Sequence, residues 1–251
     1  MREENYSDKC HLFVPNHIED ITLKIDDEVL KCEKSVKLLG ITFDNNLDFD
    51  EHVANLCKKA SQKLHALTRI APFLEMNKLR ILMKAFIESQ FNYCPLIWMF
   101  HSRKLNNRIN KIHNRALQIA YKYYSSSFEQ LLMKENSFTI HERNLQRLAT
   151  EMFKTKNGIS PSFMNNVFPN SGNNVNLRNK PSFQSFNVRS VYNGTETIYF
   201  RGPQIWSIIP ESIKIAKTVS EFQSKIKTWK PEGCMCRLCK TYIKHVGFIN
   251  C

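Results

Sequence analysis

Three cysteines near the end of the sequence have the close spacing of metal ligands. Cys234, Cys236 and Cys239 form a Cys-x-Cys-x-x-Cys pattern, whereas the other cysteines are well separated from one another. Zinc takes four thiolate or imidazole ligands in a tetrahedron, so three thiolates need one more partner. Either His245 or the last residue, Cys251, can supply it. We predict a zinc site here, with a flexible tail of reduced cysteines as the alternative.

A second group of residues with a possible binding role is a run of basic side chains that contains no acidic residue. Residues 102–122 contain no Asp or Glu, and their apolar residues recur at helical spacing. Such a face favours phosphate oxygens as partners. The alternatives are a solvated helix face, or a basic amphipathic helix that lies on a membrane or docks on a protein. The side chains predicted to contact nucleic acid are Arg103, Lys104, Arg108, Lys111 and Arg115.

The sequence has no recognisable set of residues for nucleophilic catalysis or nucleotide binding. His101, His113 and His141 lie near no Gly-x-Ser-x-Gly turn and no catalytic cysteine context, so we interpret them as helix-face or core histidines. The 7 glycines are dispersed and form no phosphate-cradling loop. No cofactor other than zinc is therefore predicted.

The composition is that of a folded, basic protein. Of 251 residues, 42% are hydrophobic, which is enough for one large core or two small ones. The 36 basic and 23 acidic residues give a net charge of +13, which favours RNA, DNA or another anionic surface as partner, with general solubility as the alternative. No run approaches the roughly 20 apolar residues of a membrane span, and the first residues lack a signal-peptide core. An intracellular location, nuclear or cytoplasmic, is therefore expected.

The apolar spacing indicates which elements must position these groups. Alternation with a period of two predicts short strands at the start of the chain, with a hairpin turn at Asp26-Asp27. From Asp48 the period becomes that of a helix, and Asp48 or Asp50 is the predicted cap. The predicted strands are residues 9–14, 21–25, 29–32 and 36–43.

Helices are predicted over most of the following sequence. Asn77 is the predicted cap of the second helix, and Pro95 requires a kink or break near Tyr93. Ser127 is the predicted cap of a later, short helix. The predicted helices after the break are residues 102–122, 127–133 and 139–156.

The last quarter of the sequence predicts one hairpin and two further helices. Strands at 186–191 and 197–200 are predicted to pair around the turn signal Asn193-Gly194. Gly202-Pro203 is predicted to open the next helix, with proline at its first position. Thr218 or Ser220 is the predicted cap of the final helix.

Several of these stretches resemble the reverse transcriptases of non-LTR retrotransposons of the jockey and CR1 kind. Residues 36–44, Val-Lys-Leu-Leu-Gly-Ile-Thr-Phe-Asp, resemble the strand and turn called motif E or primer grip, and residues 7–12 resemble the end of the preceding motif D. Further similarity lies in residues 91–98, in residues 200–206 and in the cysteine tail. The residues that match the primer grip are Leu38, Leu39 and Gly40.

The resemblance implies an order of domains. Residues 1–47 correspond to the end of the polymerase palm, and residues 48–124 to the helical thumb, which holds the template–primer duplex. The predicted fold class is α+β and predominantly α-helical, with a small antiparallel palm-remnant sheet, a thumb-like helical bundle and a C-terminal helical region with one hairpin. The remaining parts are a helical region, a linker, a hairpin with helices and a cysteine-rich tail, at 125–168, 169–180, 181–230 and 231–251.

The resemblance also implies a function. The family's polymerase holds two catalytic metal ions on carboxylates, including an Asp-Asp turn upstream of motif D. The pair Asp26-Asp27 lies downstream of the motif D-like stretch, so we interpret it as structural. We expect a catalytically inactive C-terminal fragment of an RNA-directed DNA polymerase that binds template–primer or element RNA. Its expected partners are RNA or an RNA–DNA duplex and the missing N-terminal polymerase region. The alternative is a non-catalytic protein-interaction or chromatin-associated domain derived from a transposable element.

Overall fold

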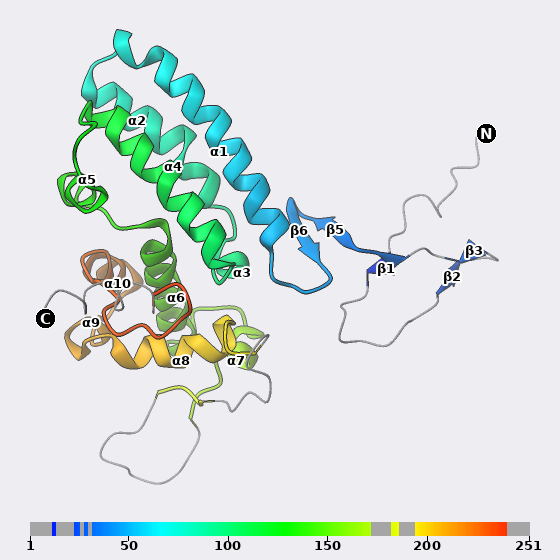
Figure 1. Cartoon of the computed structure of the whole chain (residues 1–251). Coiled ribbons are helices and arrows are strands. Elements are labelled where there is room, and N and C mark those ends of the chain that lie inside the picture. The colour runs from blue at the N-terminus through cyan, green and yellow to red at the C-terminus, as the bar shows by residue number, and fades with distance from the viewer. Residues whose placement is uncertain are drawn as a thin grey trace, which may run out of the picture.

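A computed structural model describes six stretches of the chain. They are residues 12–13, 23–25, 28–29, 32–171, 182–185 and 194–239. Figure 1 shows short strands leading into two groups of helices, an upper group that contains α1, α2 and α4 and a lower group around α6. The predicted α+β and predominantly helical fold class is confirmed.

The described strands near the start of the chain form separate pairs instead of one sheet. β2 (Lys24–Ile25) pairs antiparallel with β3 (Glu28–Val29), as the predicted hairpin requires, although the turn at Asp26-Asp27 lies outside the described residues. β1 (Leu12–Phe13) pairs parallel with β4 (Cys32–Glu33), so a purely antiparallel arrangement is wrong for this pair.

The primer-grip-like stretch is a hairpin and not the single strand predicted for residues 36–43. β5 (Ser35–Leu38) and β6 (Ile41–Asp44) pair antiparallel, with Leu38 opposite Ile41. The two residues between the strands, Leu39 and Gly40, have φ angles of 48° and 86°. A two-residue hairpin loop favours positive φ at both positions, and glycine adopts it without steric cost. The turn therefore reverses the chain within one motif.

The upper group of helices packs around one apolar core. α1, α2 and α4 are in mutual contact, as Figure 1 shows, and α5 packs against α4. Each helix buries one apolar face, as the spacing predicted. The elements are α1 (Asp50–Ile70), α2 (Met76–Phe86), α3 (Pro95–Trp98), α4 (Arg103–Tyr121) and α5 (Phe128–Glu135), with 3₁₀ turns at Ala71–Phe73 and Glu88–Phe91.

Asp48, one of the two predicted caps of α1, accepts a hydrogen bond from the backbone N–H of Asp50, the first residue of the helix, at 3.0 Å, whereas the other candidate, Asp50, lies inside the helix. The carboxylate of Asp44 accepts hydrogen bonds from the backbone N–H groups of Asp48 and Phe49, at 3.1 and 2.9 Å. Phe49 is the N-cap residue and has a left-handed backbone, with φ of 59°. Because Asp44 lies at the end of β6, the hairpin and α1 are joined at this corner.

The ends of α2 also differ in part from the prediction. Glu75 is the N-cap residue, and Asn77 lies inside the first turn, so Asn77 as cap is wrong. The predicted break near Tyr93 is confirmed, because α3 begins at Pro95 after Cys94 takes a left-handed conformation with φ of 41°. Proline suits this first helical position, where its missing N–H costs no hydrogen bond.

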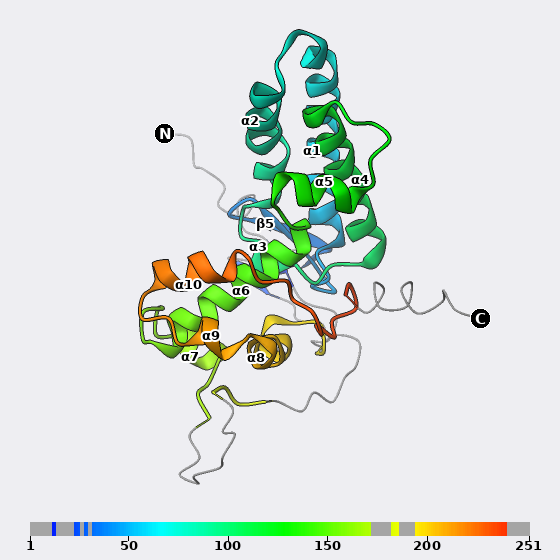
Figure 2. The same cartoon turned by 90° about the vertical axis from the view of Figure 1, so that its left-hand side faces the viewer.

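The lower group of helices forms a second core around α6. Figure 2 shows α6 running between α10 and α8, and both contact it. Thr139 and Glu142 form a capping box at the start of α6, and Ser127 with Gln130 forms another at α5. The elements are α6 (Ile140–Lys156), α7 (Met164–Val167), α8 (Ile198–Ile208), α9 (Glu211–Lys214) and α10 (Val219–Ile226).

The predicted hairpin in the last quarter is wrong where the structure describes it. Thr197 is the N-cap of α8 and accepts a hydrogen bond from the N–H of Phe200 at 3.3 Å, so residues 197–200 begin a helix. Gly202 and Pro203 lie inside α8 and do not open it. The other predicted strand, 186–191, and most of the predicted linker lie outside the described residues. The alternative cap Thr218 is confirmed for α10.

Candidate functional site

The cysteine segment, residues 231–239, follows α10 and packs into the apolar core of the lower group of helices. Cys234 and Cys236 are buried and Cys239 is half-buried. The carbonyl of Pro231 accepts from the N–H of Cys234 at 3.4 Å, and the carbonyl of Cys236 accepts from the N–H of Cys239 at 3.2 Å. Gly233, inside the first of these turns, has a φ of 85°. The two turns fold a short segment so that its three thiols meet.

An imidazole from α6 completes a group that can hold a metal ion. Nε2 of His141 lies 3.3 Å from Sγ of Cys236. The possible ligand atoms of His141, Cys236 and Cys239 all lie within 4.8 Å of one another. His141 is 5% exposed, and its Nδ1 has no hydrogen-bond partner among the described residues.

The sequence interpretation of His141 as a simple helix-face or core histidine missed this proximity. His141 and Cys236 are 95 residues apart, so no spacing pattern connects them. The predicted fourth ligand, His245, and its alternative, Cys251, lie outside the described residues.

The electrostatics of the thiols favour a bound cation. Hydrogen bonds from the thiols of Cys236 and Cys239 lower the pKa of Cys234 to about 3. Hydrogen bonds of Cys239 with the sulfurs of Cys234 and Cys236, together with burial, raise the pKa of Cys239. The cluster therefore holds one negative charge readily and resists a second. A divalent cation between the sulfurs would remove that resistance, and thiolate with imidazole is a donor set that suits zinc.

Arg237, between two of the cysteines, links this segment to the start of α4. Its Nε donates to the carbonyl of His101 at 3.2 Å, and its Nη2 donates to the carbonyl of Phe100. Its own N–H donates to both carboxylate oxygens of Glu196 at 3.2 Å. In return, Nη2 of Arg103 donates to the carbonyl of Arg237 at 3.2 Å. The segment that carries the cysteines and the basic helix are thus in direct contact through Arg237 and Arg103.

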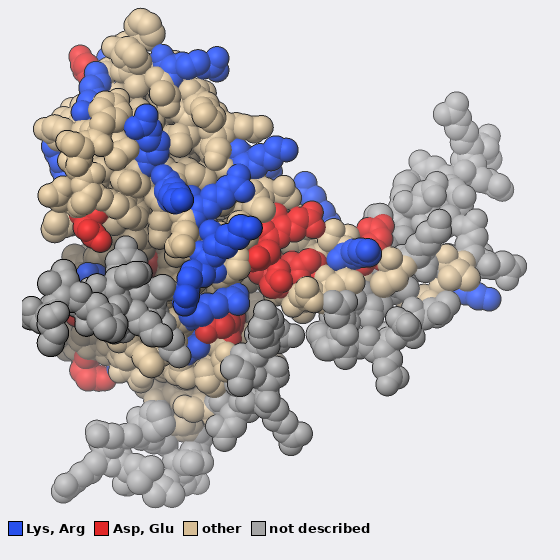
Figure 3. Space-filling model, in the orientation of Figure 1, with Lys and Arg blue, Asp and Glu red and all other residues tan. Residues whose placement is uncertain are grey.

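The five side chains predicted to contact nucleic acid are all exposed on α4. The helix has the predicted length, ends at Lys122 in a left-handed conformation, and contains no acid. None of the ion pairs among the described residues involves these five side chains. Figure 3 shows a band of Lys and Arg side chains over α4, with Asp and Glu gathered beside its lower end. The opposite face is buried through Leu105, Ile109, Ile112, Ala116 and Ile119.

Two of the five cations have contacts within the fold. Arg103 binds the carbonyl of Arg237, and Arg115 lies over the ring of Tyr124 at 5.2 Å and donates to Gln118. The other three, Lys104, Arg108 and Lys111, recur at intervals of four and three residues, so they lie along one side of the helix. These positions offer charge to an external anion.

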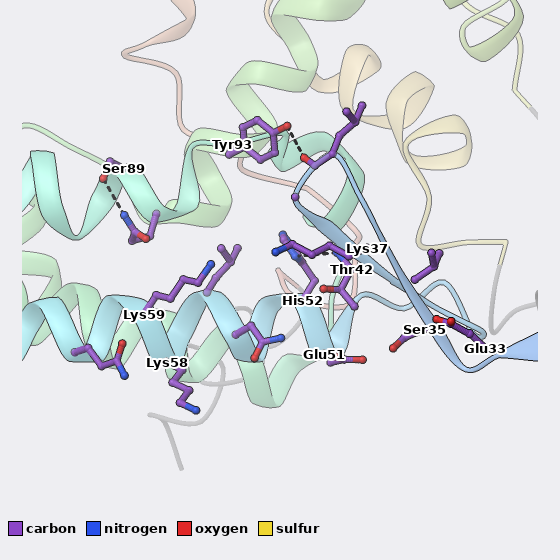
Figure 4. Close-up of a pocket in the computed structure, with 17 residues that line it drawn as sticks. Glu33, Ser35, Lys37, Thr42, Glu51, His52, Lys58, Lys59, Ser89 and Tyr93 are labelled. Atoms are coloured by element: carbon purple, nitrogen blue, oxygen red, sulfur yellow. Dashed lines mark hydrogen bonds between the residues drawn. The ribbon is translucent and has the colours of Figure 1, made fainter. Parts of the chain in front are cut away.

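A groove of about 1030 Å³ lies between the β5–β6 hairpin and α1. Leu39 and Gly40 line it, whereas the third primer-grip-like residue, Leu38, does not. The hydroxyl of Tyr93 donates to the carbonyl of Leu39 at 2.7 Å, which fastens the turn to the segment after α2. Figure 4 shows Lys37 and Lys59 pointing toward one another across this space.

His52 at the base of the groove is a structural residue. Its Nδ1 accepts from the N–H of Thr42 at 3.3 Å. Burial lowers the pKa of His52, and the charges of Lys59 and Lys37 lower it further. The neutral imidazole therefore joins β6 to α1 at physiological pH.

Comparison with protein-family models, with curated proteins and with solved structures gave no significant match. None of the helices in the described part of the chain is both long and apolar enough to cross a membrane. The described residues thus offer two candidate sites. One is the basic face of α4 together with the groove beside the β5–β6 hairpin. The other is the His/Cys group, which consists of His141, Cys236 and Cys239.

Proposed function

We propose that this chain grips nucleic acid and is a non-catalytic, C-terminal part of a retrotransposon-type reverse transcriptase. The observation that carries the proposal is the exposed, acid-free face of α4, whose cations take part in none of the described ion pairs. Like charges three or four residues apart on a helix destabilise it by a few tenths of a kcal/mol, about as much as opposite charges stabilise it. Phosphate oxygens placed beside these cations would offset that repulsion.

The length of this face suits a nucleic-acid backbone. At 1.5 Å of rise per residue, Lys104 and Arg115 are separated by roughly 16 Å along the helix axis. A duplex carries one phosphate about every 1.7 Å of its axis when both strands are counted, so several phosphates fall within that reach. The Lys and Arg side chains are long and flexible enough to reach whichever of these phosphates lies closest. We propose template–primer duplex or element RNA as the ligand.

Charge reversal with salt titration tests the grip. The triple variant Arg108→Glu, Lys111→Glu and Arg115→Glu should weaken binding to an RNA–DNA duplex and lower the slope of log affinity against log salt by about three units. Fluorescence anisotropy over a series of salt concentrations measures both quantities. Unchanged affinity in a variant with intact helicity would refute the proposal.

A matched control separates contact from net charge. The exposed side chains of Lys78, Lys217 and Lys227 belong to other helices or their flanks. Changing these three to Glu alters the net charge by the same amount as the α4 variant. The proposal requires the control to keep most of its affinity and its salt slope.

We also propose that the ion held by the His/Cys group is zinc. Soft thiolate ligands select zinc over magnesium or calcium, and the ligand atoms of His141, Cys236 and Cys239 are close enough to share one ion. Elemental analysis of protein purified under reducing conditions should find about one equivalent of zinc, as one tetrahedral site requires. Protein without metal would refute this part of the proposal alone.

A polymerase reaction by this chain is not expected. The resemblance to reverse transcriptases leaves the metal-binding Asp-Asp turn without a counterpart upstream of the motif D-like residues 7–12. Primer extension on an RNA template, with Mg²⁺ or Mn²⁺, should give no product. Templated nucleotide addition that depends on this chain would overturn the assignment.

A protein partner is the second candidate, and one surface favours it. Phe73 is 85% exposed and Ile81 is 66% exposed, and both lie on or beside α2 with Met76. Large exposed apolar side chains, where they form a contiguous patch, are typical of interaction surfaces. This alternative is a protein-interaction or chromatin-associated domain derived from a transposable element. Binding that is insensitive to salt and lost in a Phe73→Ser, Ile81→Ser variant would favour it.

A further inference from the structure

The thiol of Cys234 lies beside the group of His141, Cys236 and Cys239, although it is outside the set whose ligand atoms all lie within 4.8 Å of one another. It is 3% exposed, and it lines the same cavity as His141 and Cys239. The backbone N–H of Cys234 donates to the carbonyl of Pro231 at 3.4 Å, so a turn places Cys234 next to Cys236. A buried sulfur with this position has two uses, as a ligand or as half of a disulfide.

We infer that Cys234, Cys236, Cys239 and His141 form one closed Cys₃His site, which fastens the cysteine segment to α6. The inference rests on the proposed zinc binding and extends it by naming the full ligand set and the role of the ion. In this arrangement neither His245 nor Cys251 is a ligand.

Burial indicates a structural role for the metal. Structural zinc sites use four protein ligands, whereas catalytic sites leave one position open to water or substrate. Cys234, Cys236 and His141 are buried and Cys239 is half-buried, so little of the cluster is exposed to solvent. Four protein ligands in this setting leave no coordination position for a substrate.

The ion would join α6 to the cysteine segment, which few polar contacts connect to that helix. Nε2 of Gln146 on α6 donates to the carbonyl of Trp229 at 2.8 Å, just before the cysteine segment. Beyond that point, His141 provides the contact from α6 to Cys236. A metal bond here closes a loop of 95 residues between the two ligands. It would also fix Arg237, whose guanidinium binds the backbone immediately before α4.

Cobalt substitution in the full chain tests the ligand set directly. The intensity of the thiolate-to-cobalt charge-transfer band reports the number of sulfur ligands, and a tetrahedral site gives strong visible bands. Cys234→Ser should lower the charge-transfer band by about a third, because three thiolates become two. His141→Asn should keep the band but weaken metal affinity by more than about 100-fold, the upper end of what loss of an outer-shell partner costs.

A variant that is expected to strengthen the charge-transfer band is also needed, because misfolding could weaken the band but could not strengthen it. His141→Cys keeps four ligands and should raise the charge-transfer band by about a third, as a Cys₄ site does. Matched controls are Cys94→Ser and His65→Asn, because both side chains are exposed and neither belongs to the cluster. Both controls should bind cobalt as the parent does, with unchanged far-ultraviolet circular dichroism.

Three results would overturn the inference. Cobalt spectra and affinity unchanged in Cys234→Ser would remove Cys234 from the ligand set while leaving zinc binding intact. Metal lost in a His245→Ala, Cys251→Ser double variant would place the fourth ligand in the tail. A mass lower by two hydrogen atoms before reduction, found in protein that binds no metal and absent from its Cys234→Ser variant, would mean that Cys234 forms a disulfide. None of these results bears on the proposed nucleic-acid binding, which the affinity and salt dependence of the α4 variants test.

Discussion

The guanidinium of Arg237 donates to the carbonyl of His101 at 3.2 Å, which ties the cysteine segment to the turn that precedes the basic helix. The carbonyl of Phe100 accepts from the same side chain. Carbonyls at this position cannot be satisfied by α4, which begins at Arg103. Arg237 therefore supplies the hydrogen bonds that these two carbonyls, just before α4, do not receive from the helix itself.

Replacing Arg237 by Lys should weaken this tie. An ammonium group keeps the charge but cannot span two carbonyls with the fixed geometry of a guanidinium. Since a hydrogen bond that involves a charged group contributes about 1.5–3 kcal/mol, we expect the free energy of unfolding to fall by about 1–2 kcal/mol. Urea unfolding measures it, with Arg108→Lys on the exposed face of α4 as control. Equal stability of the two variants would contradict the prediction.

A buried carboxylate makes the fold sensitive to acid. Oε1 of Glu88 lies 3.2 Å from Nε2 of His113, and Oε2 accepts from Arg143 at 2.7 Å. Burial opposes ionisation of Glu88, but the hydrogen bond from His113 and the charge of Arg143 outweigh it. The pKa of Glu88 consequently falls from 4.5 to about 2.

The sign of the pH dependence follows from this lowered pKa. Because the folded state holds the Glu88 proton more weakly than the unfolded chain does, the contribution of Glu88 is fully present above about pH 4.5 and is lost as the pH falls toward 2. The shift corresponds to about 3 kcal/mol. Glu88→Gln should therefore lower stability at pH 6 and flatten its decline between pH 5 and 3, as urea titrations at each pH would measure.

The exposed residue Glu75 provides the control for the acid experiment. Glu75→Gln should leave both the stability and its pH profile close to those of the parent. A Glu88→Gln variant with the parent's pH profile would mean that other carboxylates control the acid response.

Features set by neighbours in the sequence were the ones that could be predicted from it. Ser127 was predicted as a cap because its hydroxyl reaches a backbone N–H three residues ahead, which is local chemistry. The exposed face of α4 was predictable for a similar reason, since a period of 3.6 residues separates its basic side chains from the buried apolar ones. Both inferences need no knowledge of the rest of the fold.

Features set by distant residues could not be predicted in this way. Asp44, at the end of the preceding hairpin, accepts from the N–H groups of Asp48 and Phe49 just before α1, and no helical spacing indicates that contact. His141 reaches Cys236 across 95 residues, and neither has a spacing that points to the other. The extent of α8 was missed because Gly202-Pro203 has the local signature of a helix start, whereas Thr197 caps the helix five residues earlier than that glycine.

Gly202 is required inside α8 by packing, and its replacement should be costly. A Cβ at this position would lie 2.5 Å from Cε1 of Phe168 and 3.4 Å from Sδ of Met152. Phe168 is fully buried, so its ring has no free space to enter. Gly202→Ala should therefore lower the free energy of unfolding by about 1–3 kcal/mol, which is typical of overpacking.

A double-variant cycle identifies the clash as the cause. Phe168→Leu removes the ring that the new methyl group meets, at the cost of a cavity. The double variant should lose less stability than the sum of the two single variants, by about 0.5 kcal/mol or more. Additive losses in thermal or urea unfolding would assign the effect of Gly202→Ala to something other than Phe168.

The groove beside the hairpin should contribute to the nucleic-acid grip. Lys37 and Lys59 face one another across it, and both are close enough to His52 to lower its pKa. Two cations held near each other in a concave site attract a phosphate more strongly than the same cations on a flat surface. Replacing both with Met should weaken duplex affinity and lower the salt slope by about two units, one for each lost phosphate contact. Anisotropy titrations at several salt concentrations measure the change.

The control for this experiment is Lys78→Met with Lys217→Met, which removes the same charge from exposed positions outside the groove. We expect the control to shift the affinity slightly and to leave the slope within the error of the parent. Tyr93→Phe adds an independent measurement, because it frees the carbonyl of Leu39 without changing the charge. It should reduce affinity with an unchanged salt slope, since the turn is loosened while the phosphate contacts remain. Equal slopes for the groove variant and its control would mean that nucleic acid does not enter the groove.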